Sequence, residues 1–193
     1  MKDYWVERYK REGRKMFATG GKQEKLLEIS KNNLSHLFAE AGINKVKNLI
    51  DYGCGYGRLE PFLHEYAEHI IGVDLLMGIV DFDVYDFVTY ISTEEFFKKD
   101  FNVDVIVTYT VMQHVVSKND FYKIMEKFYK SLKNGGYYIG VEHINPHFKV
   151  PPYMNNFSVE DYEKAFGKKI LYKTEMLTYE KGHPHIGFIF KKE

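Results

Sequence analysis

The stretch Asn48-Leu49-Ile50-Asp51-Tyr52-Gly53-Cys54-Gly55-Tyr56-Gly57-Arg58 decides the fold of this chain. A short apolar run ends in an acidic residue, and three glycines then alternate with larger residues. The residues that follow place apolar side chains at helical spacing, with Pro61 in the first turn, where its missing N–H costs no hydrogen bond. A strand, a glycine turn and a helix in this order point backbone N–H groups at a ligand above the carboxyl end of the strand. Glycine suits the turn because a side chain there would occupy the ligand's place, and because tight turns use positive φ.

An acidic residue ends the next predicted strand. The apolar run Ile70-Ile71-Gly72-Val73 predicts a strand over residues 69–75, which closes on Asp74. At about twenty residues from the turn, a carboxylate is placed to accept hydrogen bonds from both ribose hydroxyls of a nucleoside ligand. The NAD fingerprint G-x-G-x-x-G requires glycine where this chain has Arg58. The pattern therefore favours a nucleoside ligand other than NAD.

Four motifs in this order resemble those of class I S-adenosylmethionine (SAM)-dependent methyltransferases. They are residues 51–57, similar to the (D/E)-x-G-x-G-x-G signature, residues 73–75, similar to the acidic second motif, residues 104–108 with 112–115, similar to the fourth-strand motif, and residues 132–139, similar to the turn into strand five. The resemblance implies an α/β, Rossmann-like class I methyltransferase fold. This fold has a mostly parallel seven-stranded sheet with a C-terminal antiparallel hairpin and helices on both faces. SAM is then the cofactor and S-adenosylhomocysteine (SAH) its product.

The resemblance also implies a set of cofactor-binding positions. The glycine turn would approach the methionine part of SAM through Gly53, Gly55 and Gly57, and it includes the small side chain of Cys54. The other positions are Asp51 for the amino group, Asp74 for the ribose, Leu75 against the adenine, Ser92 and Thr93 at the adenine edge, and Thr108 beside the methyl channel. For Ser92 and Thr93, capping of the next helix is an equally good interpretation.

Three residues are candidates for catalysis. Methyl transfer from a sulfonium needs alignment of the acceptor and exclusion of water, and an oxygen or nitrogen acceptor also has to lose a proton. His114 follows the fourth strand on the cofactor side, and an unperturbed imidazole titrates near neutral pH. Capping a helix is the alternative role for His114. The resemblance places Tyr109 beside the methyl channel, and His143, next to Glu142 at the end of strand five, is the third candidate.

The sequence does not predict a catalytic metal. Family branches that use a divalent ion carry E-x-x-E-H after the fourth strand, and residues 110–114 of this chain read T-V-M-Q-H, without either carboxylate. Pro146 also breaks any helical face that would pair His143 with His147. No N-P-P-(Y/F) or D-P-P-Y motif follows the fourth strand, and the chain has no Pro-Cys pair. These differences argue against the common DNA, glutamine-amino and cytosine C5 methyltransferases.

Composition limits the partners. The 193 residues carry a formal net charge of zero, so no overall footprint for nucleic acid exists and we expect none as a partner. Residues 1–25 contain eight Lys and Arg and four acidic residues. This local positive charge indicates either a solvated helix face or a docking arm. One cysteine excludes an internal disulfide and fits a reducing compartment, so we expect a cytoplasmic protein. No window approaches the ~20 apolar residues of a membrane span, so no membrane association is expected.

A single methyltransferase domain is expected over residues 1–193. Residues 1–42 form an N-terminal arm and helix, and the arm is a possible lid because such a segment folds over the cofactor in many small methyltransferases of the family that the chain resembles. The alternative is that Trp5 and Tyr9 merely anchor this arm to the body. Residues 43–144 form the SAM-binding core, and residues 145–193 form a substrate loop, a short helix and the closing hairpin.

Periodicity and turn residues predict the individual elements. Helices are expected over residues 22–41 and 58–68, and a short or irregular segment is expected at 76–83. Three further helices are expected: a short one capped by Ser92 or Thr93, one starting at Ser117, and a short one capped by Ser158 and stopping at Gly167. The expected strands cover residues 46–52, 69–75, 85–91, 103–109, 137–143, 169–179 and 185–191.

Three hypotheses for function remain open. The first is a SAM-dependent methyltransferase that acts on an oxygen or nitrogen of a small-molecule acceptor. The second is a protein or RNA methyltransferase that uses the basic N-terminal arm as its docking surface. The third is a non-catalytic SAM-binding partner protein, because no residue is an unambiguous base.

Overall fold

The computed structural model describes residues 2–17, 23–79, 81, 83–144, 151–176, 178 and 185–193. The elements follow in the order α1 (Lys2–Phe17), α2 (Gln23–Glu40), β1 (Val46–Tyr52), α3 (Glu60–Tyr66), β2 (Ala67–Asp74), β3 (Val88–Ser92), α4 (Thr93–Lys98), β4 (Val103–Tyr109), the 3-10 turn η1 (Met112–His114), α5 (Lys118–Ser131), β5 (Leu132–His143), α6 (Val159–Phe166), β6 (Tyr172–Met176) and β7 (His185–Lys191).

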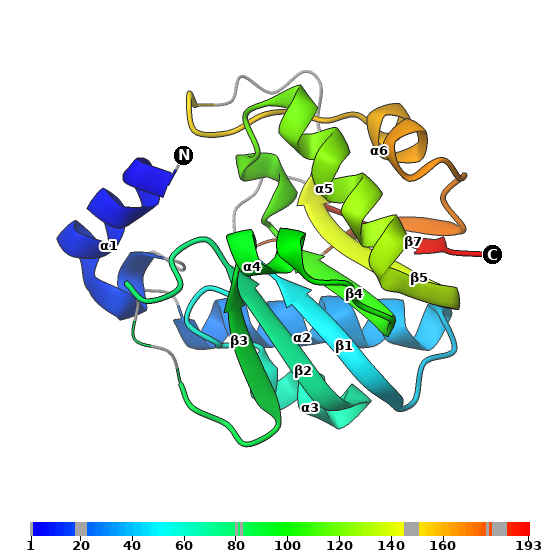
Figure 1. Ribbon diagram of the computed structural model, residues 1–193, viewed down its shortest axis with the longest axis horizontal. Coiled ribbons are helices and arrows are strands. Elements are labelled where there is room, and N and C mark those ends of the chain that lie inside the picture. Colours follow the sequence, from blue (N-terminus) through cyan, green and yellow to red (C-terminus); the bar gives the residue numbers. More distant parts are fainter. Residues whose placement is uncertain are drawn as a thin grey trace.

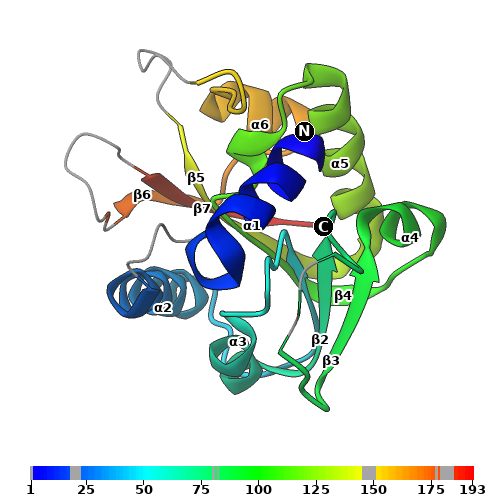
Figure 2. The same ribbon diagram turned by 90° about the vertical axis from the view of Figure 1, so that its left-hand side faces the viewer.

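The strands form one seven-stranded sheet in the order β3-β2-β1-β4-β5-β7-β6 (Figure 1). The pairs from β3 to β5 are all parallel, and β7 pairs antiparallel with both β5 and β6. The Rossmann-like fold expected from the sequence is therefore confirmed. Because the parallel strands share one direction, their carboxyl ends meet at one edge of the sheet, and α1 lies across that edge (Figure 2).

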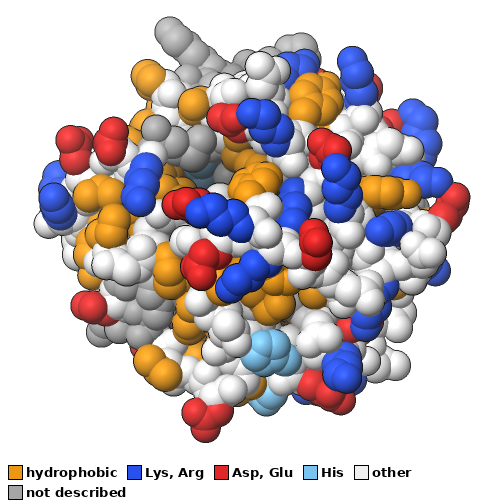
Figure 3. All heavy atoms as spheres, viewed as in Figure 1, with side chains coloured by type: hydrophobic (Ala, Val, Ile, Leu, Met, Phe, Trp, Pro, Cys, Tyr) orange, Lys and Arg blue, Asp and Glu red, His pale blue; other side chains and the backbone are white. Residues whose placement is uncertain are grey.

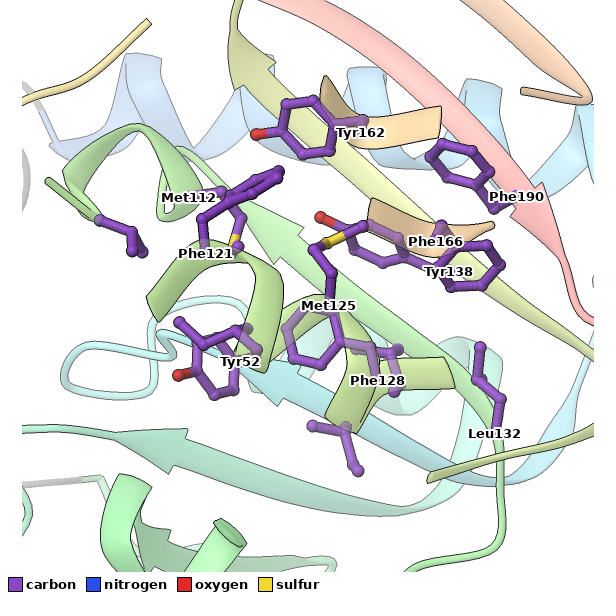
Figure 4. Packing of buried hydrophobic residues seen from close by; sticks show 14 of the residues in the cluster. Tyr52, Met112, Phe121, Met125, Phe128, Leu132, Tyr138, Tyr162, Phe166 and Phe190 are labelled. Carbon is purple, nitrogen blue, oxygen red and sulfur yellow. The ribbon is translucent and has the colours of Figure 1, made fainter. Parts of the chain in front are cut away.

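The two faces of the sheet bury different residues of the same strands, because successive side chains point to opposite faces. In β1, Leu49 packs with α2 and α3, whereas its neighbour Ile50 packs with α4, α5 and α6. Figure 4 shows the second of these clusters, where Phe128 of α5 and Tyr138 of β5 meet with ring centroids 5.1 Å apart. Both faces are thus covered by helices, as parallel sheets require.

Most element boundaries agree with the sequence, and the helix starts follow their caps. Ser92, Ser117 and Ser158 each accept a hydrogen bond from the backbone N–H three residues later, which satisfies one of the unpaired donors of a first turn. Gly167 ends α6 with φ 73°, a conformation that glycine adopts without strain. The predicted caps at Ser117, Ser158 and Gly167 are confirmed, and of the Ser92 and Thr93 alternatives Ser92 is the cap.

Described residues in the range 75–85 form turns and irregular structure and none is helical, which agrees with the short or irregular segment expected at 76–83. The chain turns directly after β2 because Leu76 donates its backbone N–H to Asp74 Oδ1 (2.8 Å) and Gly78 has φ 81°.

Several strand boundaries differ from the expectation, and β3 begins at Val88 and not at 85. β5 begins at Leu132 and not at 137, since Leu132 already pairs with Val103. β6 is shorter than the predicted 169–179, and residues 177 and 179–184 lie outside the described part.

Acidic and basic side chains are interspersed over the face seen in Figure 3. Ion pairs also form between residues four positions apart along helices, as in Lys98 with Glu94 and Lys130 with Glu126. Exposed pairs of this kind add little stability. Among the helices that the structure describes, none is long and apolar enough to cross a membrane.

Candidate active site

A cavity of about 520 Å³ opens at the carboxyl ends of β1, β2 and β4. Its walls come from α1, the glycine turn, the residues after β2, the start of α4, the segment after β4 and the start of α5. The lining residues are Lys2, Trp5, Asp51, Tyr52, Gly53, Cys54, Gly55, Tyr56, Arg58, Leu59, Val73, Asp74, Leu75, Leu76, Thr93, Phe97, Tyr109, Thr110, Val111, His114, Val115, Asp120, Lys123 and Ile124.

The glycine turn has no room for a side chain at Gly53. A Cβ built there would lie 2.3 Å from Val111 Cγ2, and the φ of 82° is one that other residues rarely adopt. Gly53 donates its backbone N–H to the carbonyl of Val73 (2.7 Å), which ties the turn to the end of β2. Gly55 has φ 63° and lines the cavity, with open space where its Cβ would be. The backbone itself therefore forms this wall of the cavity.

Asp74 joins the glycine turn to the residues after β2. Its Oδ2 accepts the backbone N–H of Gly55 (3.0 Å) and its Oδ1 accepts that of Leu76 (2.8 Å). The carboxyl is buried, and burial raises its pKa to about 6, against the opposing effect of these hydrogen bonds. Each carboxylate oxygen retains a further lone pair, so Asp74 is able to accept hydroxyl donors from the cavity.

Asp51 brings a second buried carboxyl to the floor of the cavity. It precedes Tyr52, the last residue of β1, is 2% exposed, and its Oδ2 has no hydrogen-bond partner among the described residues. Burial raises the pKa of Asp51 to about 7, although the nearby positive charge of Arg58 lowers it. An unsatisfied buried carboxyl of this kind is costly unless a ligand provides a donor or a cation.

Arg58 follows the turn and faces the same cavity. Its Nη1 donates to Ser30 Oγ of α2 (3.2 Å), and its guanidinium carbon lies 5.7 Å from the ring centroid of Tyr109. The hydroxyl of Tyr109 accepts a hydrogen bond from Asn33 Nδ2 (2.9 Å), which also belongs to α2. Burial raises the pKa of Tyr109. This hydroxyl is therefore engaged with α2 and is protonated, and the residue presents a wall to the cavity in place of a base.

His114 lies where three separate segments meet. Its Nδ1 is 3.3 Å from the backbone carbonyl oxygen of Tyr153, and its ring centroid is 4.8 Å from that of Trp5, at an interplanar angle of 88°. Burial lowers its pKa to about 4, so the imidazole is neutral at physiological pH. Since a carbonyl only accepts, Nδ1 carries the proton in this hydrogen bond, and the lone pair is on Nε2.

Trp5 of α1 and His114 form an aromatic side of the cavity, which we call the roof. Tyr4 stacks on Tyr153 with centroids 4.4 Å apart, which joins α1 to the segment after residue 150. Trp5, Val6 and Tyr9 of α1 also pack near the buried Tyr56 and Leu76. α1 therefore anchors to the body of the domain and contributes Lys2 and Trp5 to the cavity lining, and its role as a lid stays a prediction.

Three of the residues predicted to contact the cofactor, Ser92, Gly57 and Thr108, do not line the cavity. Ser92 caps α4, where its side chain and that of Glu95 form a reciprocal pair of hydrogen bonds; its neighbour Thr93 does line the cavity. Gly57 lies behind the turn, and a Cβ there would be 2.5 Å from the hydroxyl of Tyr90. Gly57 is thus required for packing and not for the wall.

Thr108 and His143 are likewise placed away from the cavity wall. The Thr108 hydroxyl is buried and lies 3.0 Å from the hydroxyl of Tyr138. His143 is 3% exposed, donates its backbone N–H to Gln113 Oε1 (2.9 Å), and has Nδ1 3.1 Å from Asn156 Oδ1. These placements do not favour the predicted methyl-channel and catalytic roles, because the polar groups of both residues are directed into the protein.

The sequence analysis missed several cavity residues. Thr110 has φ 58°, a strained conformation for a non-glycine residue, and no sequence signal predicts it. The position of Arg58 could have been predicted, since a cation directly after a glycine turn lies beside the ligand. The sequence analysis used Arg58 only to exclude the NAD fingerprint. Lys2, Phe97 and Lys123 come from separate helices that only the tertiary fold brings together.

Glu142 supports the segment that carries Thr110 and His114. It is fully buried at the end of β5, and its Oε1 accepts the backbone N–H of Val111 (3.2 Å) and its Oε2 that of Gln113 (3.4 Å). Burial raises the pKa of Glu142 to about 7. Among the described residues, no group of three or more His, Cys, Asp or Glu side chains is arranged to hold a metal ion.

The donors and acceptors of the cavity fit a nucleoside that carries an amino-acid head group. Asp74 is placed for ribose hydroxyls, and Leu75 and Thr93 line the wall beyond it. The Asp51 oxygen without a described partner suits an ammonium group. The class of protein defined by this fold and cavity is a Rossmann-like domain that binds a nucleoside cofactor at the carboxyl edge of its sheet.

Comparison with known proteins identifies the family. The model of the methyltransferase domain family matches residues 21–176, and the chain belongs to this family. Together, the family and the fold identify a SAM-dependent methyltransferase. No curated protein sequence matches the chain.

Solved structures with the same fold include three methyltransferases. The N-methyltransferase NodS from Bradyrhizobium japonicum WM9, in complex with SAH, has a TM-score of 0.75 at 11% identity and covers 99% of this chain and 98% of that one. The 1,6-didemethyltoxoflavin-N1-methyltransferase of Burkholderia thailandensis, with its acceptor and SAH, has a TM-score of 0.73 at 13% identity, covering 99% and 86%. A SAM-dependent methyltransferase from Leishmania major has a TM-score of 0.76 at 14% identity, covering 98% and 82%.

When bound, SAM supplies a methyl group already activated by the sulfonium. The protein's part is then to align the acceptor, exclude water and accept a proton. The glycine turn and Asp74 form the rigid side of the cavity, and the roof, which contacts the carbonyl of Tyr153 through His114, forms another side.

Proposed function

We propose that this methyltransferase acts on an oxygen or nitrogen of a small-molecule acceptor. The proposal rests on one observation, the aromatic roof over the cavity. Trp5 lines the cavity and packs on His114, and Tyr4 of the same helix stacks on Tyr153, so α1 borders one side of the cavity and is itself held by the segment from residue 151. A cavity bordered by such a packed roof suits a compact molecule, whereas the surface of a folded protein or RNA would need a broad open approach.

The basic arm gives little support to a macromolecular acceptor. In α1, Glu12 accepts hydrogen bonds from Arg8 Nε (2.9 Å) and Arg11 Nη2 (2.8 Å), so part of the positive charge is neutralised within the helix. Another cation, Lys2, lines the cavity. The described part of α1 thus forms the roof and is less suited to docking on a phosphate backbone.

Within this proposal, His114 is the base. Its Nδ1–H is held by the carbonyl of Tyr153, which leaves Nε2 to accept the acceptor's proton. A neutral imidazole is ready for this role at physiological pH. Of the other two candidates, Tyr109 forms part of the cavity wall and His143 supports the site from within the protein. The cofactor-binding roles of Asp51, Gly53, Cys54, Gly55, Asp74, Leu75 and Thr93 belong to the same proposal.

The cytoplasm remains the predicted compartment. Cys54 is buried beside the cavity, and burial raises its thiol pKa well above the usual value, so the side chain is a neutral thiol. A single unpaired cysteine is compatible with a reducing environment.

Methyl-labelled SAM incubated with a fractionated cell extract tests the acceptor class. We expect labelled product in the low-molecular-weight fraction. Label in the protein or RNA fraction, with binding that weakens steeply as salt rises, would instead support the macromolecular hypothesis. SAH binding without label in any fraction would support the non-catalytic hypothesis.

His114→Asn tests the base. The amide keeps a donor for the Tyr153 carbonyl but has no titratable nitrogen. We expect labelling to slow by about 100- to 10,000-fold, the usual contribution of a general base, with SAH affinity within about twofold of the wild type. Unchanged labelling would show that proton removal does not use His114.

A further inference from the structure

We propose that Glu142 is a positioning residue for methyl transfer: it holds residues 110–114 in a strained turn and so sets where Thr110 and His114 face in the cavity. The proposal rests on the function proposed above, in which His114 accepts the proton. Glu142 itself lies outside the cavity lining, so it acts on the acceptor only through the residues of this turn.

The turn after β4 is strained at Thr110. Its φ of 58° is in the left-handed region, and Thr110 is the only non-glycine residue with a positive φ in the described part of the chain. This conformation is unfavourable for a β-branched side chain. Strain of this kind persists only where the surrounding structure holds it, and it concentrates at functional sites. Thr110 lines the cavity, so the strained residue belongs to the site.

The carboxyl of Glu142 accepts the hydrogen bonds that hold the turn. Its Oε1 accepts the backbone N–H of Val111 (3.2 Å) and its Oε2 that of Gln113 (3.4 Å). The backbone N–H of Met112, between them, also favours the ionised carboxyl. Successive N–H groups that converge on one anion form a nest, a backbone arrangement that includes a left-handed residue. The charge of Glu142 therefore stabilises the conformation that is strained at Thr110.

The two neighbours of Glu142 in β5 bind the same turn. The carbonyl of Val141 accepts the backbone N–H of Thr110 (2.7 Å), and His143 donates its backbone N–H to Gln113 Oε1 (2.9 Å). Neither of these bonds uses a group that titrates near neutral pH. Among these three strand residues, only Glu142 holds the turn through a group whose charge changes with pH.

The turn connects Glu142 to both sides of the cavity. The carbonyl of Val111 accepts the backbone N–H of His114 (2.9 Å), and both residues line the cavity. Val111 also fills the space beside Gly53, where a Cβ would lie 2.3 Å from Val111 Cγ2. A shift of the turn would therefore move the base relative to the glycine turn. A misplacement of about 1 Å is enough to lower a rate about 100-fold.

The charge of Glu142 changes near neutral pH. Burial raises its pKa to about 7, although the backbone N–H donors and the Thr108 hydroxyl lower it. Tyr109 of β4, Tyr138 of β5 and Tyr162 of α6 interact with it electrostatically, and burial raises the pKa of each, so these hydroxyls stay neutral. Below pH 7 the carboxyl gains a proton, which takes the place of one bond to the backbone and loosens the turn.

The first test needs neither cofactor nor acceptor. Trp5, the only tryptophan of the chain, packs on His114, so its fluorescence reports on the turn. We expect the wild-type fluorescence to change with a midpoint near pH 7, and this change to be absent in Glu142→Gln. Asp51→Asn, which removes the other carboxyl with a pKa of about 7, should keep the change. Glu175→Gln, at an exposed position of β6, is the matched control and should behave as the wild type.

The second test measures the reaction. Methyl-labelled SAM at a saturating concentration labels the low-molecular-weight fraction of a cell extract, and the rate is followed from about pH 6 to 9. At pH 8, Glu142→Gln should be slower than the wild type by about 10- to 100-fold, with SAH affinity within about threefold. The wild-type rate should fall toward that of the variant below pH 7, whereas the rate of the variant should be flat, because His114 titrates far lower.

A second substitution separates positioning from stability. Glycine adopts a φ of 58° without strain, so Thr110→Gly should make the turn less dependent on Glu142. We expect Glu142→Gln to slow labelling by less than about threefold in a chain that already carries Thr110→Gly. If Glu142 acted only on stability, its loss would have the same effect in both chains.

Three outcomes would overturn the proposal. They are wild-type Trp5 fluorescence that stays constant from about pH 6 to 8, labelling by Glu142→Gln at the wild-type rate, and equal losses with and without Thr110→Gly. If Glu142→Gln does not fold, the wild type is compared with Thr110→Gly, and an equal fall of both rates below pH 7 would overturn it.

Failures of the proposed function give different results. Labelling by His114→Asn at the wild-type rate would remove the base, and with it the role of Glu142. Wild-type protein that labels no fraction would remove the reaction itself, whatever the fluorescence shows.

Discussion

The glycine turn at residues 53–57 and the roof formed by Trp5 and His114 border the same cavity, but they are held together over different distances along the chain. The bond from Gly55 to Asp74 spans 19 positions, inside one strand–helix–strand unit. The contact of His114 with Tyr153 spans 39 positions, and Tyr4 and Trp5 reach them from the opposite end of the chain. The turn uses backbone geometry, and the roof uses side chains packed between separate elements.

This difference predicts unequal tolerance to change. A backbone wall such as that at Gly53 has one conformation, because φ and the space around Cβ allow no alternative. A wall of packed rings such as Trp5 and His114 is able to rearrange at the cost of some contact area. We therefore expect the largest effects on cofactor binding at the turn and the smallest at the roof.

Gly53→Ala is expected to have the largest effect. The added Cβ meets Val111 at 2.3 Å and must also adopt φ 82°, so we expect the free energy of unfolding to fall by about 2–6 kcal/mol. SAH affinity should fall by roughly 100-fold or more. Denaturant unfolding and calorimetry measure both quantities.

Gly78→Ala is the matched control for this variant. Gly78 has φ 81° but nothing within 4 Å of its Cβ position, and it is absent from the cavity wall. We expect a loss of about 1–2 kcal/mol from the backbone conformation alone, with SAH affinity unchanged. Equal effects of the two substitutions would show that the close approach at Gly53 has no special role.

The next largest effect on SAH affinity is expected from a change of pH. Asp51 has a pKa of about 7 because of burial, so it is protonated below this pH and ionised above it. The ligand's ammonium group favours the ionised form. Affinity should therefore rise about tenfold per pH unit up to pH 7 and level off above.

Asp51→Asn should remove the rise of SAH affinity with pH near neutrality, and the variant should bind SAH with the weaker affinity at every pH measured. Asp74, with a pKa of about 6, titrates lower, so the range from pH 6 upward reports chiefly on Asp51. A slope that persists in Asp51→Asn would assign the titration to another group, such as Glu142.

The roof is expected to show the smallest effect. Trp5→Ala should weaken SAH binding by only about threefold, because the backbone wall at Gly53 and Gly55 stays in place. The same change exposes His114, whose pKa should rise from about 4 toward the usual value, as measured by NMR titration of the imidazole.

Trp5 is also the only tryptophan of the chain, so its fluorescence in the wild type reports directly on ligands that enter beneath the roof. Leu171→Ala, at an exposed position far from the cavity lining, serves as the control. If Trp5→Ala lost as much SAH affinity as Gly53→Ala, the result would contradict the expected difference between the roof and the glycine turn.

The parts predicted well from the sequence share one property: short-range patterns encode them. The strand ending at Asp51, the glycines, Asp74 and the serine caps of α5 and α6 each depend on residues within one supersecondary unit. Their conformations follow from φ preferences, capping and periodicity, so the order of motifs was enough to predict the sheet and its cofactor edge. Of the two forms expected for residues 76–83, short or irregular, the described residues adopt the irregular one, because Leu76 donates a hydrogen bond to Asp74 and the chain turns at Gly78.

By itself, then, the sequence determined the Rossmann-like fold, the cofactor and the glycine turn. Only the tertiary structure decided which polar groups face the cavity. It directed Thr108 and His143 into the protein, gave the hydroxyl of Tyr109 to Asn33, and brought Arg58 onto Ser30. The physical reason is that the direction and charge of a side chain depend on the partners packed around it, and these partners come from segments far apart in the chain.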